Sequence, residues 1–78
     1  MTQREAVEWI AALFEIPPQE LTRDTLRDDI PAWDSLGVLS LLAGLDSEFG
    51  IVLSDDDVPS MKGVGDVLEI MRRNGKLT

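Results

Sequence analysis

The stretch that decides the fold is DSLGVLSLLAGLDSEFG, which runs from Asp34 to Gly50. Placed at about 100° per residue, its large apolar side chains fall mainly in one broad arc, which predicts a helix over Ser35 to Phe49. The arc consists of Val38, Leu39, Leu41, Leu42, Leu45 and Phe49. The opposite side is small and nearly uncharged, so another backbone can approach it closely; it consists of Leu36, Gly37, Ser40, Ala43, Gly44 and Ser47. Gly50 suits the left-handed conformation that ends helices.

The N-terminal residues predict a first amphipathic helix of about three turns. Thr2, with Glu5 three residues later, has the spacing of a capping box, in which side chains and backbone bond reciprocally. Pro17 and Pro18 prevent the helix from continuing beyond about Glu15, because proline lacks the N–H that a helix requires. The buried face should consist of Ala6, Val7, Ile10, Leu13 and Phe14.

From Pro17 to Trp33 the chain should form a long ordered loop, since this segment contains three prolines and only scattered apolar residues. A loop of this length usually has a function. Its apolar side chains should turn inward as anchors, because so small a domain cannot leave them all in water. These anchors are Leu21, Leu26, Ile30 and Trp33.

The C-terminal part predicts one short helix and one longer one. Ser54 should cap the short helix, with Asp55, Asp56 and Asp57 in its first turn and Pro59 limiting its length. The last helix has apolar residues at helical spacing and closes at Asn74-Gly75; the apolar residues are Val64, Val67, Leu68 and Met71. We therefore expect an all-α fold in one domain, residues 1–78: a small four-helix bundle of three main helices and one short helix, with the long loop between the first and second.

The composition excludes most catalytic chemistry. The 78 residues contain no cysteine and no histidine, which removes disulfides, thiolate nucleophiles, imidazole acid–base chemistry and the usual zinc ligands. Asp55 to Asp57 lack the alternating spacing of a calcium loop, so no metal site is expected. The net charge of −8 should repel nucleic acid and anionic membranes; it either serves solubility or docks basic partner surfaces. The uncharged run from Ser35 to Leu45 is too short to cross a bilayer. We expect a soluble, cytoplasmic monomer that is not an enzyme.

Ser35 stands directly before the apolar run, where serine is often simply a helix cap. However, a reciprocal capping box would require Glu or Gln where Val38 stands, and Asp34 can cap the helix equally well. Ser35 is therefore not required for capping. A phosphodiester on its hydroxyl would lie at the positive end of the helix, where free amides stabilise an anion.

The order of elements resembles the acyl carrier protein family across essentially all of the chain. The resemblance rests on Trp33-Asp34-Ser35-Leu36, Glu48-Phe49-Gly50-Ile51, the acidic Asp55-Asp56-Asp57 and Val64, which match the family's spacing without gaps. It implies that Ser35 accepts 4′-phosphopantetheine from coenzyme A through a phosphopantetheinyl transferase, with Asp34 and Leu36 completing the attachment motif. An acyl group held as a thioester on that arm would then pass between acyl-loading and acyl-transfer or condensing enzymes of lipid, polyketide or related biosynthesis.

The same resemblance suggests roles for the rest of the second helix. An acyl chain would fold back against Val38, Leu39, Leu42 and Phe49, unless these are simply core. Partner enzymes would contact the surface formed by Leu36, Gly37, Ser40, Ala43, Gly44, Asp46, Ser47 and Glu48. Fatty-acid-synthesis carriers usually place acids where Gly37, Ser40 and Ser47 stand, so a specialised carrier is expected. Gly37 and Gly44 each cost about 1 kcal/mol relative to alanine, which suggests that a partner or the arm lies close to them.

Two other functions remain open at this stage. In one, the chain is a small acidic helical interaction module in which Ser35 is only a cap; in the other, it is a carrier-like domain that has lost its modification. The start at Met1 and the full set of helices favour a freestanding protein over an excised synthase domain.

Overall fold

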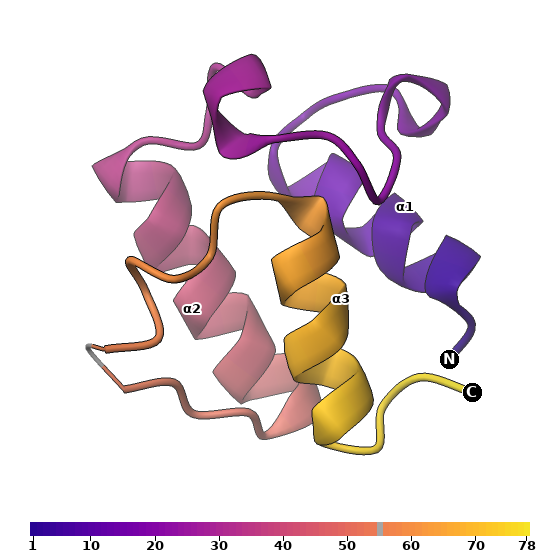
Figure 1. Cartoon of the computed structure of the whole chain (residues 1–78), viewed down its shortest axis with the longest axis vertical. Coiled ribbons are helices and arrows are strands. Elements are labelled where there is room, and N and C mark those ends of the chain that lie inside the picture. Colours follow the sequence, from indigo (N-terminus) through magenta and orange to yellow (C-terminus); the bar gives the residue numbers. More distant parts are fainter. Residues whose placement is uncertain (55) are drawn as a thin grey trace.

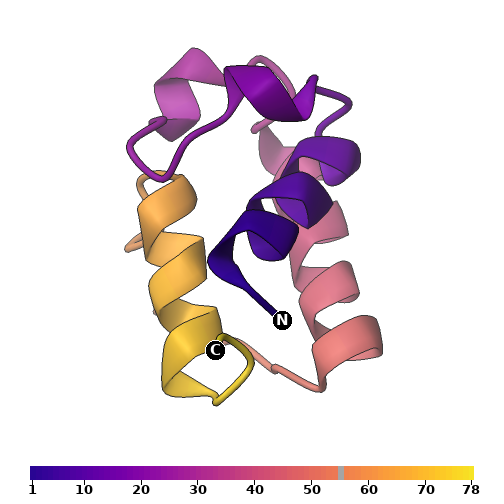
Figure 2. The same ribbon diagram turned by 90° about the vertical axis from the view of Figure 1, so that its right-hand side faces the viewer.

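The computed structural model describes residues 1–54 and 56–78, and within them it is all-helical. Three α-helices account for most of the regular structure: α1 (Gln3–Leu13), α2 (Ser35–Phe49) and α3 (Val64–Arg73). Two single 3-10 turns, η1 (Pro18–Glu20) and η2 (Arg27–Asp29), lie in the loop between α1 and α2. As Figure 1 shows, α2 and α3 run in the same direction. α1 runs the opposite way and packs against both (Figure 2). The predicted all-α class is confirmed.

α2 and α3 end where the sequence predicted, whereas α1 ends at Leu13, two residues before the predicted limit of about Glu15; each helix is followed by a left-handed residue. The capping box at the start of α1 is confirmed, since Thr2 Oγ1 accepts from the Glu5 N–H at 3.1 Å and Glu5 Oε1 accepts from the Thr2 N–H at 2.9 Å. Gly50 closes α2 with φ of 66° and Gly75 closes α3 with φ of 72°. At the end of α1 this role falls to a residue other than glycine, Glu15, with φ of 58°.

The core forms where α1 meets α2 and α3, and it extends under the long loop. Two of the predicted loop anchors, Leu21 and Ile30, are buried, and Trp33 is half-buried. Leu26 was predicted to turn inward and does not, because its side chain is 54% exposed. The loop is instead attached through its backbone at this point. Leu26 forms an antiparallel bridge with Gly63, and the adjacent Arg27 N–H donates to the Lys62 carbonyl at 2.9 Å. The loop is thereby fastened to the start of α3.

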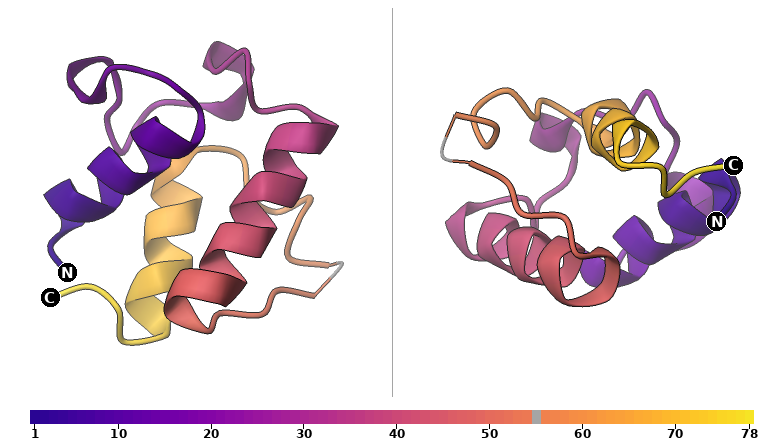
Figure 3. Two further views of the ribbon diagram at one scale, coloured as in Figure 1. Left: turned by 180° about the vertical axis from the view of Figure 1, so that it is seen from behind. Right: turned by 90° about the horizontal axis from the view of Figure 1, so that it is seen from below.

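The predicted short third helix is replaced by successive turns over residues 56–60 in the described part of the chain. Asp57 Oδ2 accepts from both the N–H and the hydroxyl of Ser54 at 3.0 Å, which closes the first turn and lowers the pKa of the Asp57 carboxyl. Pro59 has no N–H, so a continuous helical ladder cannot form. Asp55, the first of the three predicted helix-start acids, lies outside the described residues. In the described residues the bundle therefore has three α-helices, with the turns of residues 56–60 where the fourth helix was predicted (Figure 3).

Candidate cofactor attachment site

Ser35 is the first residue of α2, and the cap is its neighbour. Asp34 Oδ1 accepts a hydrogen bond from the Gly37 N–H at 2.9 Å, and the Asp34 carbonyl accepts from the Val38 N–H at 2.9 Å. Ser35 is exposed, and its hydroxyl makes no hydrogen bond to any of the residues that the structure describes. Since Asp34 supplies the side-chain cap at the Gly37 N–H, Ser35 is not needed as the cap and its hydroxyl is available for chemistry.

Two contacts hold the chain in place just before Ser35. The ring of Trp33 stacks on that of Phe14 with centroids 5.1 Å apart and planes 16° apart, which ties the loop to the end of α1. Beside this stack, the Ala32 carbonyl oxygen lies only 1.9 Å from where a β-carbon on Gly37 would be. Glycine at this position therefore lets the loop cross the first turn of α2. Ser35 is thus presented by a turn that is packed on one side and open on the other.

The space beside Gly37 and the space beside Gly44 are both filled by other parts of this chain. This corrects the prediction that an outside partner or the arm approaches the two glycines. A β-carbon on Gly44 would lie 2.8 Å from Cζ2 of Trp9 in α1. The same indole donates from Nε1 to Glu48 Oε2 at 2.6 Å. Gly37 therefore lets the loop pack closely against α2, and Gly44 lets α1 do the same. Glu48 takes part in the contact between α1 and α2.

Six of the exposed residues of α2 form an outer stripe with few charges. We define this outer stripe as Leu36, Leu39, Ser40, Ala43, Asp46 and Ser47, all of which are exposed. Leu39 was predicted to belong to the buried arc, but 62% of its surface is exposed, and Leu36 is 73% exposed. Leu39 sits at the edge of the apolar arc, where no neighbouring element covers it. Two large apolar side chains therefore flank Ser35 in water.

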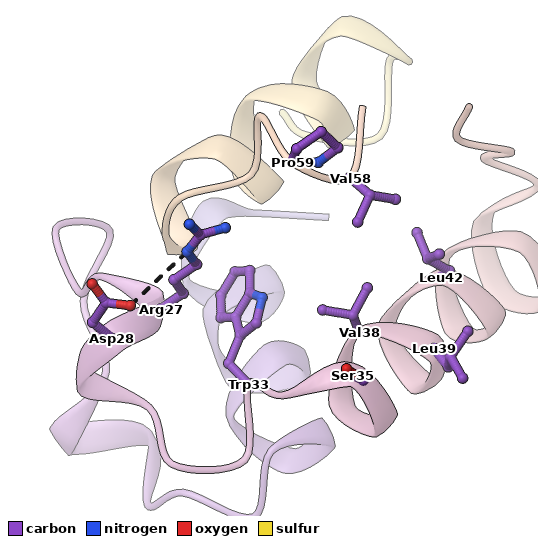
Figure 4. A pocket seen from close by; sticks show the side chains of 9 residues that line it. All are labelled: Arg27, Asp28, Trp33, Ser35, Val38, Leu39, Leu42, Val58 and Pro59. Carbon is purple, nitrogen blue, oxygen red and sulfur yellow. Dashed lines mark ion pairs between the residues drawn. The ribbon is translucent and has the colours of Figure 1, made fainter. Parts of the chain in front are cut away.

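A cleft of about 630 Å³ opens beside Ser35. Figure 4 shows α2 along one side of it, with η2 and the turn segment on the other. Three of the four residues predicted to border an acyl chain line this cleft, namely Val38, Leu39 and Leu42. Phe49, the fourth, does not line it: its ring packs edge-on against Trp9 with centroids 5.0 Å apart, near the other end of α2. The site brings Ser35 together with three of the four predicted residues and leaves out Phe49.

The remaining walls of the cleft come from residues that the sequence did not assign to a site. They are Arg27, Asp28, Trp33, Val58 and Pro59. Trp33 was expected only as a loop anchor, and the other four belong to loop segments without helical periodicity. No local signal could have found them, since they come from segments distant in sequence; the long loop is joined to residues 62–64 by the Leu26–Gly63 bridge and by hydrogen bonds from the Arg27 N–H to the Lys62 carbonyl and from the Val64 N–H to the Thr25 carbonyl.

Within the described residues, no helix is long and apolar enough to cross a membrane, and no group of three or more acidic, histidine or cysteine side chains could hold a metal ion.

Comparison with known proteins found relatives over nearly the whole chain, although no family model matches it. The chain is 25% identical to an acyl carrier protein of Porphyromonas gingivalis, over 95% of each protein. It is 28% identical to a meromycolate extension acyl carrier protein of Mycobacterium tuberculosis, over 94% of this chain and 67% of that one. The solution NMR structure of the holo acyl carrier protein from Geobacter metallireducens superposes with a TM-score of 0.78 and 27% identity, over 94% of this chain and 84% of that one.

Proposed function

Because its sequence and fold make this chain a member of the acyl carrier protein family, we propose that Ser35 carries 4′-phosphopantetheine and that the protein presents acyl thioesters on this arm to partner enzymes. The observation that carries the proposal is an exposed Ser35 hydroxyl that has no partner among the described residues, beside a helix cap supplied by Asp34. In an interaction module that used Ser35 only as a cap, the Ser35 hydroxyl and not the Asp34 carboxylate would accept from the first turn of α2.

The residues around Ser35 fit a phosphodiester. The first N–H groups of α2 have no partner within the helix, so Ser35 and Leu36 present amides and the positive end of the helix dipole to an anion. Asp34 stays engaged with the Gly37 N–H, which holds this turn in shape. The bound arm would supply the thiol that the chain itself lacks.

The cleft supports a place for the acyl chain. We assign Val38, Leu39 and Leu42 to this role, because they line the cleft that Ser35 also borders. We leave Phe49 out because its ring is committed to Trp9. An apolar acyl chain entering the cleft would cover surface that Leu39 otherwise exposes to water, which favours burial of the chain.

The outer stripe supports partner docking of an unusual kind. Its residues beside Ser35 are Leu36, Leu39, Ser40 and Ala43, and the first acid along it is Asp46. We propose that the transferase and the loading and condensing enzymes contact this stripe mainly through apolar and neutral groups. This is the basis for proposing a specialised carrier of lipid, polyketide or related biosynthesis, since an electrostatic dock would use charges beside Ser35, where the stripe has none before Asp46.

The test is to incubate the protein with coenzyme A and a broad-specificity phosphopantetheinyl transferase and to measure its intact mass. The expected result is one phosphopantetheinyl adduct on the wild type and none on Ser35→Ala. Ser60→Ala, which removes an exposed hydroxyl outside α2 and outside the outer stripe, should still be modified fully. The proposal fails if the folded wild type gains no adduct, or if Ser35→Ala gains one.

A further inference from the structure

The cleft beside Ser35 combines an apolar lining with two hydrogen-bond donors that the rest of the described chain does not use. Val38, Leu39 and Leu42 supply the apolar wall along α2. Across from them lie the indole of Trp33 and the guanidinium of Arg27 (Figure 4). A cleft built only to hold hydrocarbon has no need of either donor.

The Trp33 indole is held rigidly, yet its N–H makes no hydrogen bond to any described residue. Its ring is fixed by the stack on Phe14, with centroids 5.1 Å apart. In Figure 4 the ring nitrogen lies on the side that faces Val38 across the cleft. The other tryptophan differs, because Trp9 donates its indole N–H to Glu48 at 2.6 Å. Of the two indoles, only that of Trp33 offers a donor to a ligand in the cleft.

Arg27 supplies the second donor from a fixed position on the opposite rim. Its backbone N–H donates to the Lys62 carbonyl at 2.9 Å, which anchors η2 beside the cleft. Its side chain pairs with Asp28 at 4.0 Å, a separation too long for a hydrogen bond, and it remains 44% exposed. The guanidinium therefore keeps donors free for a ligand, while the Asp28 carboxylate beside it offsets its charge.

We propose that this cleft selects acyl chains that carry an uncharged oxygen, a carbonyl or hydroxyl group, over plain hydrocarbon chains of the same length. The inference rests on the proposed attachment of the arm to Ser35. A carbonyl oxygen in the cleft accepts from the Trp33 indole N–H, with Arg27 as a second donor on the opposite rim, whereas a hydrocarbon that fills the cleft takes water away from the Trp33 N–H and leaves it unpaired. A carboxylate is disfavoured, because Asp28 lies on the same rim and the whole chain has a net charge of −8.

The experiment compares two chains on one protein. The transferase loads Ser35 from non-hydrolysable analogues of octanoyl- and 3-oxooctanoyl-coenzyme A, and intact mass confirms each adduct. The two indole N–H resonances are then followed by nitrogen-15 NMR. With the oxo chain, the Trp33 resonance should move downfield and its hydrogen exchange should slow about fivefold relative to the octanoyl form, the factor expected for one net hydrogen bond. The Trp9 resonance, already bonded to Glu48, serves as the internal control and should not move.

Two variants identify the donors. Trp33→Phe keeps an aromatic ring against Phe14 but has no N–H, and Arg27→Met keeps the aliphatic stem without the guanidinium. In the wild type, the oxo chain should raise the melting temperature more than the octanoyl chain does, and each variant should reduce this difference. Equal Trp33 shifts with both chains, or a larger effect of octanoyl, would overturn the inference while leaving the carrier function intact. Failure of both analogues to form an adduct would instead refute the proposed function.

Discussion

Replacing Gly37 with alanine should destabilise the protein, although alanine in a helix interior is normally about 1 kcal/mol better than glycine. The reason is the loop that crosses the first turn of α2. A β-carbon at this position would lie 1.9 Å from the Ala32 carbonyl oxygen and 3.1 Å from Cε1 of Phe14. The oxygen belongs to the backbone, and Phe14 is buried in the core. Neither can rotate away as an exposed side chain would.

The magnitude follows from the displacement required. The carbonyl must retreat by about 1.5 Å to reach ordinary contact, which begins at about 3.4 Å, and this shifts a loop that is held by the Trp33–Phe14 stack. Overpacking of this kind typically costs about 1–3 kcal/mol, and a clash with backbone belongs at the upper end or above. After subtraction of the gain in helix propensity, we expect a net loss of about 2 kcal/mol. In a domain of this size that corresponds to a fall in melting temperature of about 10 °C.

The assay is urea and thermal unfolding followed by circular dichroism. The matched control is Ser40→Ala, at an exposed position of the same helix, where alanine should be neutral or raise the free energy of unfolding by a few tenths of a kcal/mol. A Gly37→Ala protein as stable as the wild type or more so would refute the reasoning, because helix propensity would then outweigh the close approach of the loop.

Three further outcomes are expected. Glu15→Gly should raise the free energy of unfolding by about 1 kcal/mol, since Glu15 holds a left-handed conformation that glycine adopts without strain; a loss of stability in urea unfolding would contradict this. The hydrogen bonds from Thr2 lower the pKa of Glu5 from its ordinary value of 4.5, so the capping box should stabilise the protein above that pH and lose its effect as the pH falls through the lower folded value. Urea midpoints measured across this range should vary less with pH in Glu5→Gln than in the wild type. The same pH profile in both proteins would count against the capping box. Finally, the affinity of partner enzymes should depend little on salt and acquire salt dependence in Ala43→Glu, whereas a steep loss with salt in the wild type would rule out neutral docking.

The sequence alone was sufficient for the features that depend on neighbours along the chain. The bounds of α2, the Thr2–Glu5 capping box and the closing glycines at 50 and 75 were all predicted, because helical periodicity and end chemistry act over a few residues. Asp34 as the alternative cap followed from the same local rules. The prediction of a short third helix was wrong. The hydrogen bonds between Ser54 and Asp57, together with Pro59, favour turns, which the acid content of the segment does not reveal.

Only the tertiary structure decided what each side of α2 contacts. Periodicity identified Gly37 and Gly44 as small residues, but it could not say that the Ala32 carbonyl and the Trp9 ring occupy the space beside them. In the same way, Leu39 belongs to the apolar arc by its angle, yet no element covers it.

The cleft shows most clearly which residues the sequence could identify and which only the tertiary structure brings to the site. Ser35 was found from the sequence because helix starts have local signals, whereas Arg27 and Trp33 reach the same site through a bridge and a ring stack between distant segments. Contacts between distant segments depend on how the whole chain packs, which no stretch of sequence specifies by itself.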